Sequence, residues 1–438
     1  MIKPAALLAL SVLLVCACQA QSVLSLEQAI ANALEKNYDI RLARYDSTTA
    51  AIDYDFRNAG FLPRLNGTLG TTWNNNAQRQ TLSDNSKRNK SGLRSNNINA
   101  QLALNWTLFD GLRMFATRER LEQLLEVGEI EIRRQIDTTI AGVIDAYYNI
   151  VRQKQQLRAI EEQMSIDSER VRLAQYRLDI GAGAKPDLLQ SKIDLNAQKS
   201  AQLQQLSLIS QLREQLNQST GQPQFGVFDV VDTIIINTGI TLGEVLTYAE
   251  KNDPSVRIAQ KNIDIAKTVL KETKADFFPV ISFNSAYNFN QTTNQVVLNN
   301  FSTLFNQVKG LNYGFTASIP ILNNFTTRRL VRQANWNIQY QGLVFENQRS
   351  FTTLNVINAY QAYEEHKKEL ALEEDNITLA RENLDIVLQM YKLSAATLLQ
   401  LKEAQQSLQD AYTRLIAARY TAKVSETQLL RLGGQLVK

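Results

Sequence analysis

The chain has 438 residues, of which 44% are hydrophobic and 21% are charged. These values are typical of a folded protein and exclude a collagen-like or disordered chain. The net charge of +4 is small for this length, and no predicted helix is rich in Lys and Arg, so we expect no nucleic-acid binding. Only 7 residues are proline, so the chain can form very long uninterrupted helices.

Residues 1–20 have the pattern of a secretory signal peptide. A basic residue precedes an apolar run over 5–15, and small residues follow it, so cleavage is expected after Ala20. The alternative is that Cys18 becomes a lipidated first residue. Cys16 and Cys18 are the two cysteines of the sequence, so cleavage after Ala20 leaves an exported protein without a disulfide. No later run has the apolar length of a spanning helix, so any membrane insertion must use strands.

The rest of the sequence repeats once. Residues 24–74 align without a gap with 240–290, at a constant offset of 216, and Phe61-Leu62-Pro63 falls on Phe277-Phe278-Pro279. A period of this length indicates a duplicated half and not a solenoid of small units. The sequence therefore predicts a first repeat, a linker and a second repeat, at 21–221, 222–239 and 240–438.

Each repeat holds two segments in which apolar and polar residues alternate, which predicts strands with one apolar face. The other face carries uncharged amide and hydroxyl groups. The segments have about the length of a tilted outer-membrane strand, roughly 9–11 residues. A soluble β-sandwich is the alternative, but four matching strands, an export signal and aromatic residues along the strands favour a membrane barrel. The predicted strands are 64–74, 97–109, 280–290 and 311–322.

Four strands are too few to close into a barrel, and open sheet edges cannot face lipid. Several copies must therefore share one barrel. Two copies would give eight strands with a filled interior, whereas three would give twelve strands and an open lumen. The segment 75–96 between the first two strands is expected to be a solvated extracellular loop, and no binding role is assigned to it. Its basic residues are Arg79, Lys87, Arg88, Lys90 and Arg94.

Seven-residue spacing of apolar residues predicts long helices with coiled-coil packing. One column in the first repeat runs from Ile136 to Leu178, and the second repeat reproduces it from Val356 to Tyr391. The longer helices would reach about 100 Å. Shorter helices over 26–60 and 242–276 precede the strands. An isolated coiled-coil rod is the alternative, but it leaves the strands unused. The predicted long helices are 112–180, 187–219, 325–392 and 398–433.

The sequence Leu24-Ser25-Leu26-Glu27-Gln28-Ala29-Ile30, the later Phe61-Leu62-Pro63, and the segment from Tyr391 to Gln405 resemble the TolC-like outer-membrane efflux protein family. The resemblance spans essentially all of the mature chain. It implies an α+β membrane protein, namely a homotrimer with a twelve-stranded outer-membrane β-barrel, to which each chain gives four strands. That barrel would continue into a periplasmic α-helical barrel.

The same resemblance implies a function and partners. The chain would be the exit duct of a tripartite pump, joined through a periplasmic adaptor protein to an inner-membrane transporter. It would lie in outer-membrane lipid and pass small molecules or secreted polypeptide to the outside.

By resemblance, the periplasmic end is closed by an acidic ring and a tyrosine-centred network. Matching the family motif places the ring at Gln400 and Glu403, the tyrosine at Tyr391 and its carboxylate partner at Asp187. Gln400 stands where the family more often has an acid, which implies one carboxylate per chain in the ring. The residues that would contact the adaptor are Tyr176, Gly181, Gly183, Ser394 and Ala395. Asp187 directly follows Pro186, so a first-turn carboxylate that favours the helix dipole is the alternative for it.

Catalysis is not expected. The one histidine, His366, lies in a charged helical stretch, and the sequence holds no Cys/His metal motif, phosphate-binding loop or nucleophile motif. No cofactor is expected. A structural or adhesin-like outer-membrane protein is one alternative, and a passive porin is another, although a porin would not need helices of about 100 Å.

Overall fold

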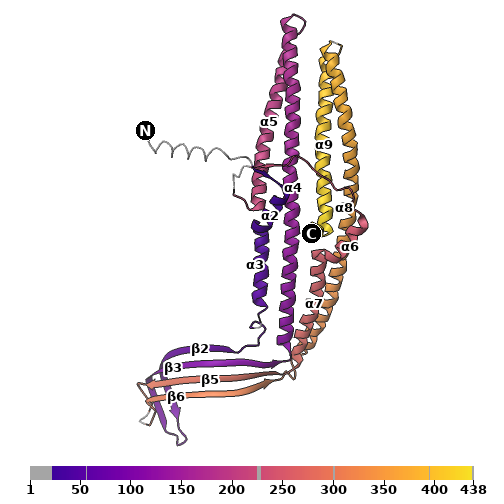
Figure 1. The fold of residues 1–438 in the computed structure, drawn as a ribbon. Coiled ribbons are helices and arrows are strands. Elements are labelled where there is room, and N and C mark those ends of the chain that lie inside the picture. The colour runs from indigo at the N-terminus through magenta and orange to yellow at the C-terminus, as the bar shows by residue number, and fades with distance from the viewer. Residues whose placement is uncertain (1–21, 56, 224–227, 299–300, 394, 437–438) are drawn as a thin grey trace, which may run out of the picture. The chain divides into compact units, whose positions relative to one another are not determined.

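The structure is a computed structural model that describes residues 22–55, 57–223, 228–298, 301–393 and 395–436 (Figure 1). The predicted signal peptide, Cys18 and Ser394 lie outside the described residues. The chain divides into two compact units, which we describe separately. The helical unit comprises Met1–Asp46, Glu129–Ile258 and Phe345–Lys438, and the sheet unit comprises Ser47–Gly128 and Ala259–Val344.

The two repeats give matching sets of helices. The longest are α4 (Arg113–Asp179) and α8 (Thr326–Lys392), each of 67 residues and therefore about 100 Å long. Each is followed by a shorter partner, α5 (Lys185–Thr220) or α9 (Leu398–Leu432). Within the described part of the chain, no helix is long and apolar enough to cross a membrane. The short helices are α2 (Leu26–Lys36), α3 (Tyr38–Asp53), α6 (Leu242–Asn252) and α7 (Pro254–Lys274).

Each short segment predicted as one helix before the strands is two helices in the structure. The break falls at Asn37 in the first repeat and at Asp253 in the second. The Asn37 Oδ1 accepts hydrogen bonds from the backbone N–H groups of Asp39 (2.8 Å) and Ile40 (3.2 Å). The Asp253 Oδ1 accepts one from Val256 N–H at 3.0 Å. Each side chain therefore caps backbone N–H groups in the first turn of a new helix. In a continuous helix those N–H groups would instead bond to carbonyls of the preceding turn.

The core of the helical unit contains the heptad column predicted from the sequence. Val143 and Ile150 of α4 are buried, as are Val356 and Tyr363 of α8. A short parallel pair of strands, β1 (Ser22–Leu24) and β4 (Phe228–Val230), packs against the apolar residues around Val143 and Ile150. This pair brings the linker beside the beginning of the first repeat. The core is therefore formed by apolar residues from segments far apart in the sequence.

The sheet unit contains one antiparallel sheet with the order β2-β3-β5-β6. The two repeats meet in its middle, where β3 pairs with β5, and the edges are β2 and β6. All four chain connections to helices lie at the same end of the sheet, because Asp110 pairs with Val280, which pairs with Ser318. The strands are β2 (Arg64–Thr81), β3 (Lys87–Asp110), β5 (Val280–Asn294) and β6 (Phe305–Ser318).

The register aligns the apolar residues of all four strands on one face. Leu69 pairs with Ala100, Ala100 with Phe289, and the next row holds Leu102, Tyr287 and Leu311. In the single chain this face is open, and the Leu69 side chain is 81% exposed. The opposite face holds uncharged polar and small residues. They include Asn66, Thr68, Asn99, Gln101, Asn284, Asn288, Asn312 and Thr316.

The strand ends differ from those predicted. Strands β2 and β3 continue past the predicted bounds at 74 and 97 and meet in a tight turn at 82–86, so most of the predicted loop 75–96 is a β-hairpin. The last strand, β6, ends at Ser318 and not at 322. Pro320 lies just beyond and has no N–H for a ladder hydrogen bond, so it cannot continue the strand.

The junction of β3 and α4 is a close approach of two backbones. Gly111 has a φ of +73°, and a Cβ added to it would lie 2.5 Å from the carbonyl oxygen of Ala275. Asp110 directly before it caps α4, because its Oδ2 accepts a hydrogen bond from Met114 N–H at 3.0 Å. Only glycine fits this left-handed position beside another chain segment.

Candidate functional site

The turn between α4 and α5 has the geometry of a Schellman motif. The Ala182 N–H donates to the Arg177 carbonyl at 2.8 Å, and the Gly181 N–H donates to the Leu178 carbonyl at 3.1 Å. Gly181 has a φ of +76°, and a Cβ on Gly183 would lie 2.8 Å from the Cβ of Arg177. Both glycines are therefore required by the turn itself, whatever it contacts.

The turn between α8 and α9 ends in a capping box. The Thr397 Oγ1 accepts a hydrogen bond from Gln400 N–H at 3.3 Å, and the Gln400 Oε1 accepts one from Thr397 N–H at 2.9 Å. Ala395 N–H donates to the Met390 carbonyl at 2.8 Å. The Gln400 side chain, which the sequence assigns to an acidic ring, therefore satisfies backbone groups at the start of α9.

Both turns expose apolar side chains. Tyr176 and Leu189 are exposed beside the first turn, and Leu393 and Leu399 beside the second, where Leu393 reaches 79% exposure. We call these two turns with their exposed neighbours the helix tips.

Tyr391, the predicted centre of the gate, is only 4% exposed. The Arg177 guanidinium lies over its ring, 4.4 Å from the centroid, and donates a hydrogen bond to its carbonyl oxygen at 2.6 Å. Arg177 is on α4 and Tyr391 is on α8, so this contact joins the two repeats directly behind the tips. A guanidinium over an aromatic face is an attractive electrostatic contact.

The other predicted gate residues lie elsewhere at the tips. Asp187 is exposed on the first turn of α5, and the structure records no hydrogen bond between its carboxylate and the Tyr391 hydroxyl, both of which are described. Glu403 is exposed on α9, one turn after Gln400. The structure therefore brings Tyr391 together with Arg177, a residue that the sequence prediction did not include.

A buried ionic cluster, which the sequence analysis did not predict, lies farther from the tips. Its central residue, Arg170 of α4, is 3% exposed. The guanidinium donates hydrogen bonds to Asp194 of α5 and, at 2.8 Å, to the Gln405 Oε1 of α9. Asp167 lies 3.6 Å from Arg170, and Lys402 lies 2.9 Å from Asp194. We define the buried ionic cluster as Asp167, Arg170, Asp194, Lys402 and Gln405.

The carboxylates of this cluster have different environments. Burial raises the pKa of Asp167 above its ordinary value, although the positive charge of Arg170 partly opposes the rise. Burial also acts to raise the pKa of Asp194, but hydrogen bonds from Lys402 and Gln190 outweigh it and leave that pKa below its ordinary value. One arginine thus compensates two carboxylates on different helices, which couples α4, α5 and α9.

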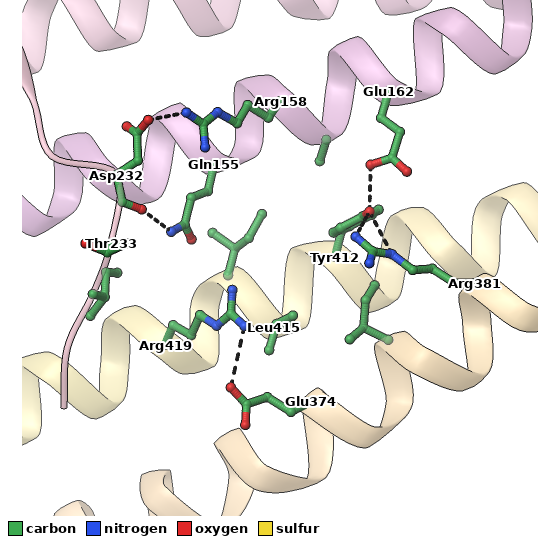
Figure 2. A pocket seen from close by; sticks show the side chains of 14 residues that line it. Gln155, Arg158, Glu162, Asp232, Thr233, Glu374, Arg381, Tyr412, Leu415 and Arg419 are labelled. Atoms are coloured by element: carbon green, nitrogen blue, oxygen red, sulfur yellow. Dashed lines mark hydrogen bonds and ion pairs between the residues drawn. The ribbon is translucent and has the colours of Figure 1, made fainter. Parts of the chain in front are cut away.

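A cavity of about 630 Å³ lies between α4, α8, α9 and the segment that follows β4 (Figure 2). Its three guanidinium groups are each engaged. Arg158 pairs with Asp232, Arg419 with Glu374 at 3.5 Å, and Arg381 donates to the Tyr412 hydroxyl. That hydroxyl donates to Glu162 at 2.6 Å. Three acids balance three arginines, so the cavity has no surplus charge for a ligand.

Chemistry-bearing residues are few elsewhere. Among the described residues, no group of three or more His, Cys, Asp and Glu side chains could hold a metal ion. His366 Nδ1 lies 3.2 Å from the Ser425 hydroxyl, a contact between helices α8 and α9. This contact ties α8 to α9 within the helical unit.

Comparison with known proteins identifies the family. A family model described as outer membrane efflux protein matches residues 29–222 and 245–435. The chain is 19% identical over 418 residues to the outer membrane protein TolC of Salmonella enteritidis, covering 92% of this chain and 81% of that protein. It is 21% identical over 414 residues to the cation efflux system protein CusC of Escherichia coli, covering 92% and 85%.

Solved structures share the fold. The chain superposes with a TM-score of 0.74 on a membrane protein from Pseudomonas aeruginosa, at 18% identity and with 93% of each chain covered. It superposes with a TM-score of 0.72 on the outer membrane protein VceC of Vibrio cholerae, at 14% identity and with 93% and 96% covered. The chain belongs to the outer membrane efflux protein family, a family of transport channels, and is located in the outer membrane with its helical portion in the periplasm.

Proposed function

We propose that three copies of this chain form the exit duct of a tripartite efflux pump. The strands of the three copies close a twelve-stranded barrel in the outer membrane, and the long helices form a tube through the periplasm. A periplasmic adaptor protein joins the helix tips to an inner-membrane transporter. The energy for transport comes from that transporter.

The observation that carries this proposal is the open sheet. Strands β2 and β6 are its edges, and large apolar side chains of one face, such as Leu69, Trp73 and Tyr313, are exposed in the single chain. Unpaired backbone groups at a sheet edge are very unfavourable in lipid, so each β6 edge must pair with the β2 edge of another copy. Three copies of four strands give a barrel wide enough for a lumen.

The polar face of the sheet would line that lumen. It carries amide and hydroxyl groups without charged side chains in the middle of the strands, and cross-strand hydrogen bonds such as Asn284 to Thr316 (3.1 Å) hold them in place. Uncharged polar walls let water and diverse solutes pass, so selection among substrates falls to the transporter.

The test is genetic epistasis in the source organism. Deleting this gene should raise the intracellular accumulation of pump substrates, and deleting the inner-membrane transporter as well should raise it no further. Unchanged accumulation in the single deletion would point to a structural or adhesin-like protein. Slower uptake of small solutes in the deletion strain would point to a passive porin.

For the gate, we expect Arg177→Gln to increase the open population about tenfold. The substitution removes the cation–π contact with Tyr391 and one hydrogen bond, together roughly 1.5 kcal/mol, and 1.4 kcal/mol is a factor of ten in population. Single-channel conductance of the reconstituted protein in planar bilayers measures this. Tyr391→Phe keeps the ring and should change conductance little, whereas Tyr391→Leu should behave like Arg177→Gln. Equal effects of Phe and Leu would show that the hydroxyl, and not the ring, closes the gate.

For selectivity, we propose that Glu403 supplies the negative charge at the narrow end. Glu403→Gln should then roughly halve the cation-to-anion permeability ratio, because a ring of carboxylates attracts cations to the entrance. Reversal potentials in a salt gradient give this ratio. Glu365→Gln removes another exposed carboxylate of the helical unit and serves as the control; an equal effect of both would remove Glu403 from the gate.

A further inference from the structure

We propose that the outer end of the sheet binds the phosphate groups of outer-leaflet glycolipid, the lipid A of lipopolysaccharide. The site is a set of cations on the lipid-facing side of the strands, which we call the cationic rim: Arg79, Lys87, Arg94 and Lys309. The inference rests on the outer-membrane location, on the sheet register and on the proposed barrel, in which the apolar face meets lipid. It does not depend on a pump partner.

The strand register places these cations on the apolar face. Trp73 lies on that face, and Asn75, two residues later on β2, pairs with Arg94. Beyond the bulge between Asn76 and Gln78, Thr81 pairs with Lys87. Because alternate residues of β2 share a face, Arg79 and the Thr81–Lys87 pair continue the face of Trp73. By the same count, Arg88 and Lys90 lie on the opposite, lumen side.

On the other edge of the sheet, Lys309 of β6 lies on the same face, in the row of Leu69, Ala100 and Phe289. It pairs with Phe289, and its Nζ lies 5.6 Å from the centre of that ring. The next row of this face toward the outer end is polar, with Gln307 on β6 and Gln291 on β5, and the row after it holds Phe305 and Thr293. A lysine over an aromatic ring can hold its stem against lipid and its ammonium at the headgroup level.

The orientation follows from chain connectivity. All four connections to helices are at one end of the sheet, and the helical portion is periplasmic, so the β2–β3 turn is at the extracellular end. Cations that continue the lipid-facing side at this end lie where the outer-leaflet headgroups lie. The tight turn at 82–86 and the paired strands hold them on an ordered hairpin, to which the sequence analysis assigned no role.

The cationic rim also lacks acidic partners among the described residues. Its four residues are exposed, and no salt bridge to any of them is found among the described residues. The sequence of residues 64–110 and 280–318 contains two acids, Asp84 in the tight turn and Asp110 at the periplasmic end. Cations therefore outnumber the single acid, Asp84, at the outer end. Phosphate is a group that guanidinium binds with two parallel hydrogen bonds.

The experiment titrates the full-length assembled protein in mild detergent with bisphosphorylated lipid A and measures binding by native mass spectrometry. Arg79→Gln/Arg94→Gln should weaken binding about tenfold or more, because each cation near an anionic lipid surface contributes roughly a fivefold gain. Arg88→Gln/Lys90→Gln removes the same charge from the lumen side of the same hairpin and should change binding less than about twofold. Arg79→Lys/Arg94→Lys should retain most of the affinity, which separates lost charge from a misfolded hairpin.

Four results would overturn the proposal. The outward pair could bind lipid A as tightly as the wild type. The lumen-side pair could lose as much affinity, which would make the effect one of net charge. Dephosphorylated lipid A could bind equally well, and the site would then recognise acyl chains. Inorganic phosphate at millimolar concentration could displace lipid A, and the site would then recognise free anions.

Discussion

Arg170→Leu is expected to destabilise the helical unit by about 3–5 kcal/mol, since removing one partner of a buried ion pair leaves an uncompensated charge. Arg170 is the buried group that compensates both Asp167 and Asp194. Without it, Asp167 would keep only the amide hydrogen bonds from Gln163 and Gln405. Leucine fills part of the space but cannot satisfy either carboxylate. Thermal unfolding of the purified protein followed by helical circular dichroism, together with hydrogen exchange in α4, α5 and α9, measures the loss.

Two further variants test the reason for this loss. Arg172→Leu removes a neighbouring arginine that is 77% exposed and paired only with Glu169, and it should cost less than about 0.5 kcal/mol. Adding Asp167→Asn to Arg170→Leu should recover part of the lost stability, because the amide removes the buried charge at Asp167, whereas Asp194 keeps its contacts with Lys402 and Gln190. If the double variant is as unstable as the single one, packing and not charge compensation explains the role of Arg170.

Gly111→Ala is expected to prevent assembly of the protein in the outer membrane. The new Cβ would lie 2.5 Å from the Ala275 carbonyl oxygen and 2.9 Å from the Phe278 Cβ, and the residue would also have to hold a φ of +73°. Backbone strain of this kind costs roughly 1–3 kcal/mol before any clash is counted. The clash is with backbone, which cannot rotate away, so the strand–helix junction must shift.

The yield of oligomer that resists heating in sodium dodecyl sulfate measures this prediction. Gly60→Ala is the matched control, because Gly60 has a φ of +88° but its added Cβ would meet nothing within 4 Å. That variant isolates the conformational strain and should reduce the yield only slightly. A normal yield of the Gly111→Ala oligomer would mean that the junction is looser than the structure indicates.

The sequence predicted the order of the elements well where the apolar period was long and regular. The heptads over α4 and α8 and the alternation in the middle of each strand repeat several times. Each repeat places an apolar side chain on the same face of the element, where packing stabilises the predicted helix or strand. The ends of β2 and β3 were not predicted because their polar outer parts, such as the Gln80–Arg88 pair, have no apolar alternation to detect. Backbone pairing holds those residues in the strands.

The contact between Arg177 and Tyr391 was missed for a different reason, and the gate itself stays a prediction. The sequence predicted Tyr391 as its centre, but the contact with Arg177 joins residues of two repeats and needs the packed fold. Two missed features had readable signals. Thr397-x-x-Gln400 is the pattern of a capping box, and Asp167 stands three residues after Met164 of the heptad column, at a position that faces the core. A charge at such a position predicts a buried partner.

The open apolar face has a consequence for biogenesis. Leu69, Trp73, Tyr313 and Phe315 are all largely exposed in the folded single chain, and none of them gains cover until lipid and neighbouring copies are in place. Between export and membrane insertion, each chain must therefore cross an aqueous compartment with this apolar sheet face exposed. An exposed apolar face with open strand edges favours aggregation. We therefore expect that either a chaperone covers this surface or the protein inserts into the membrane faster than it aggregates.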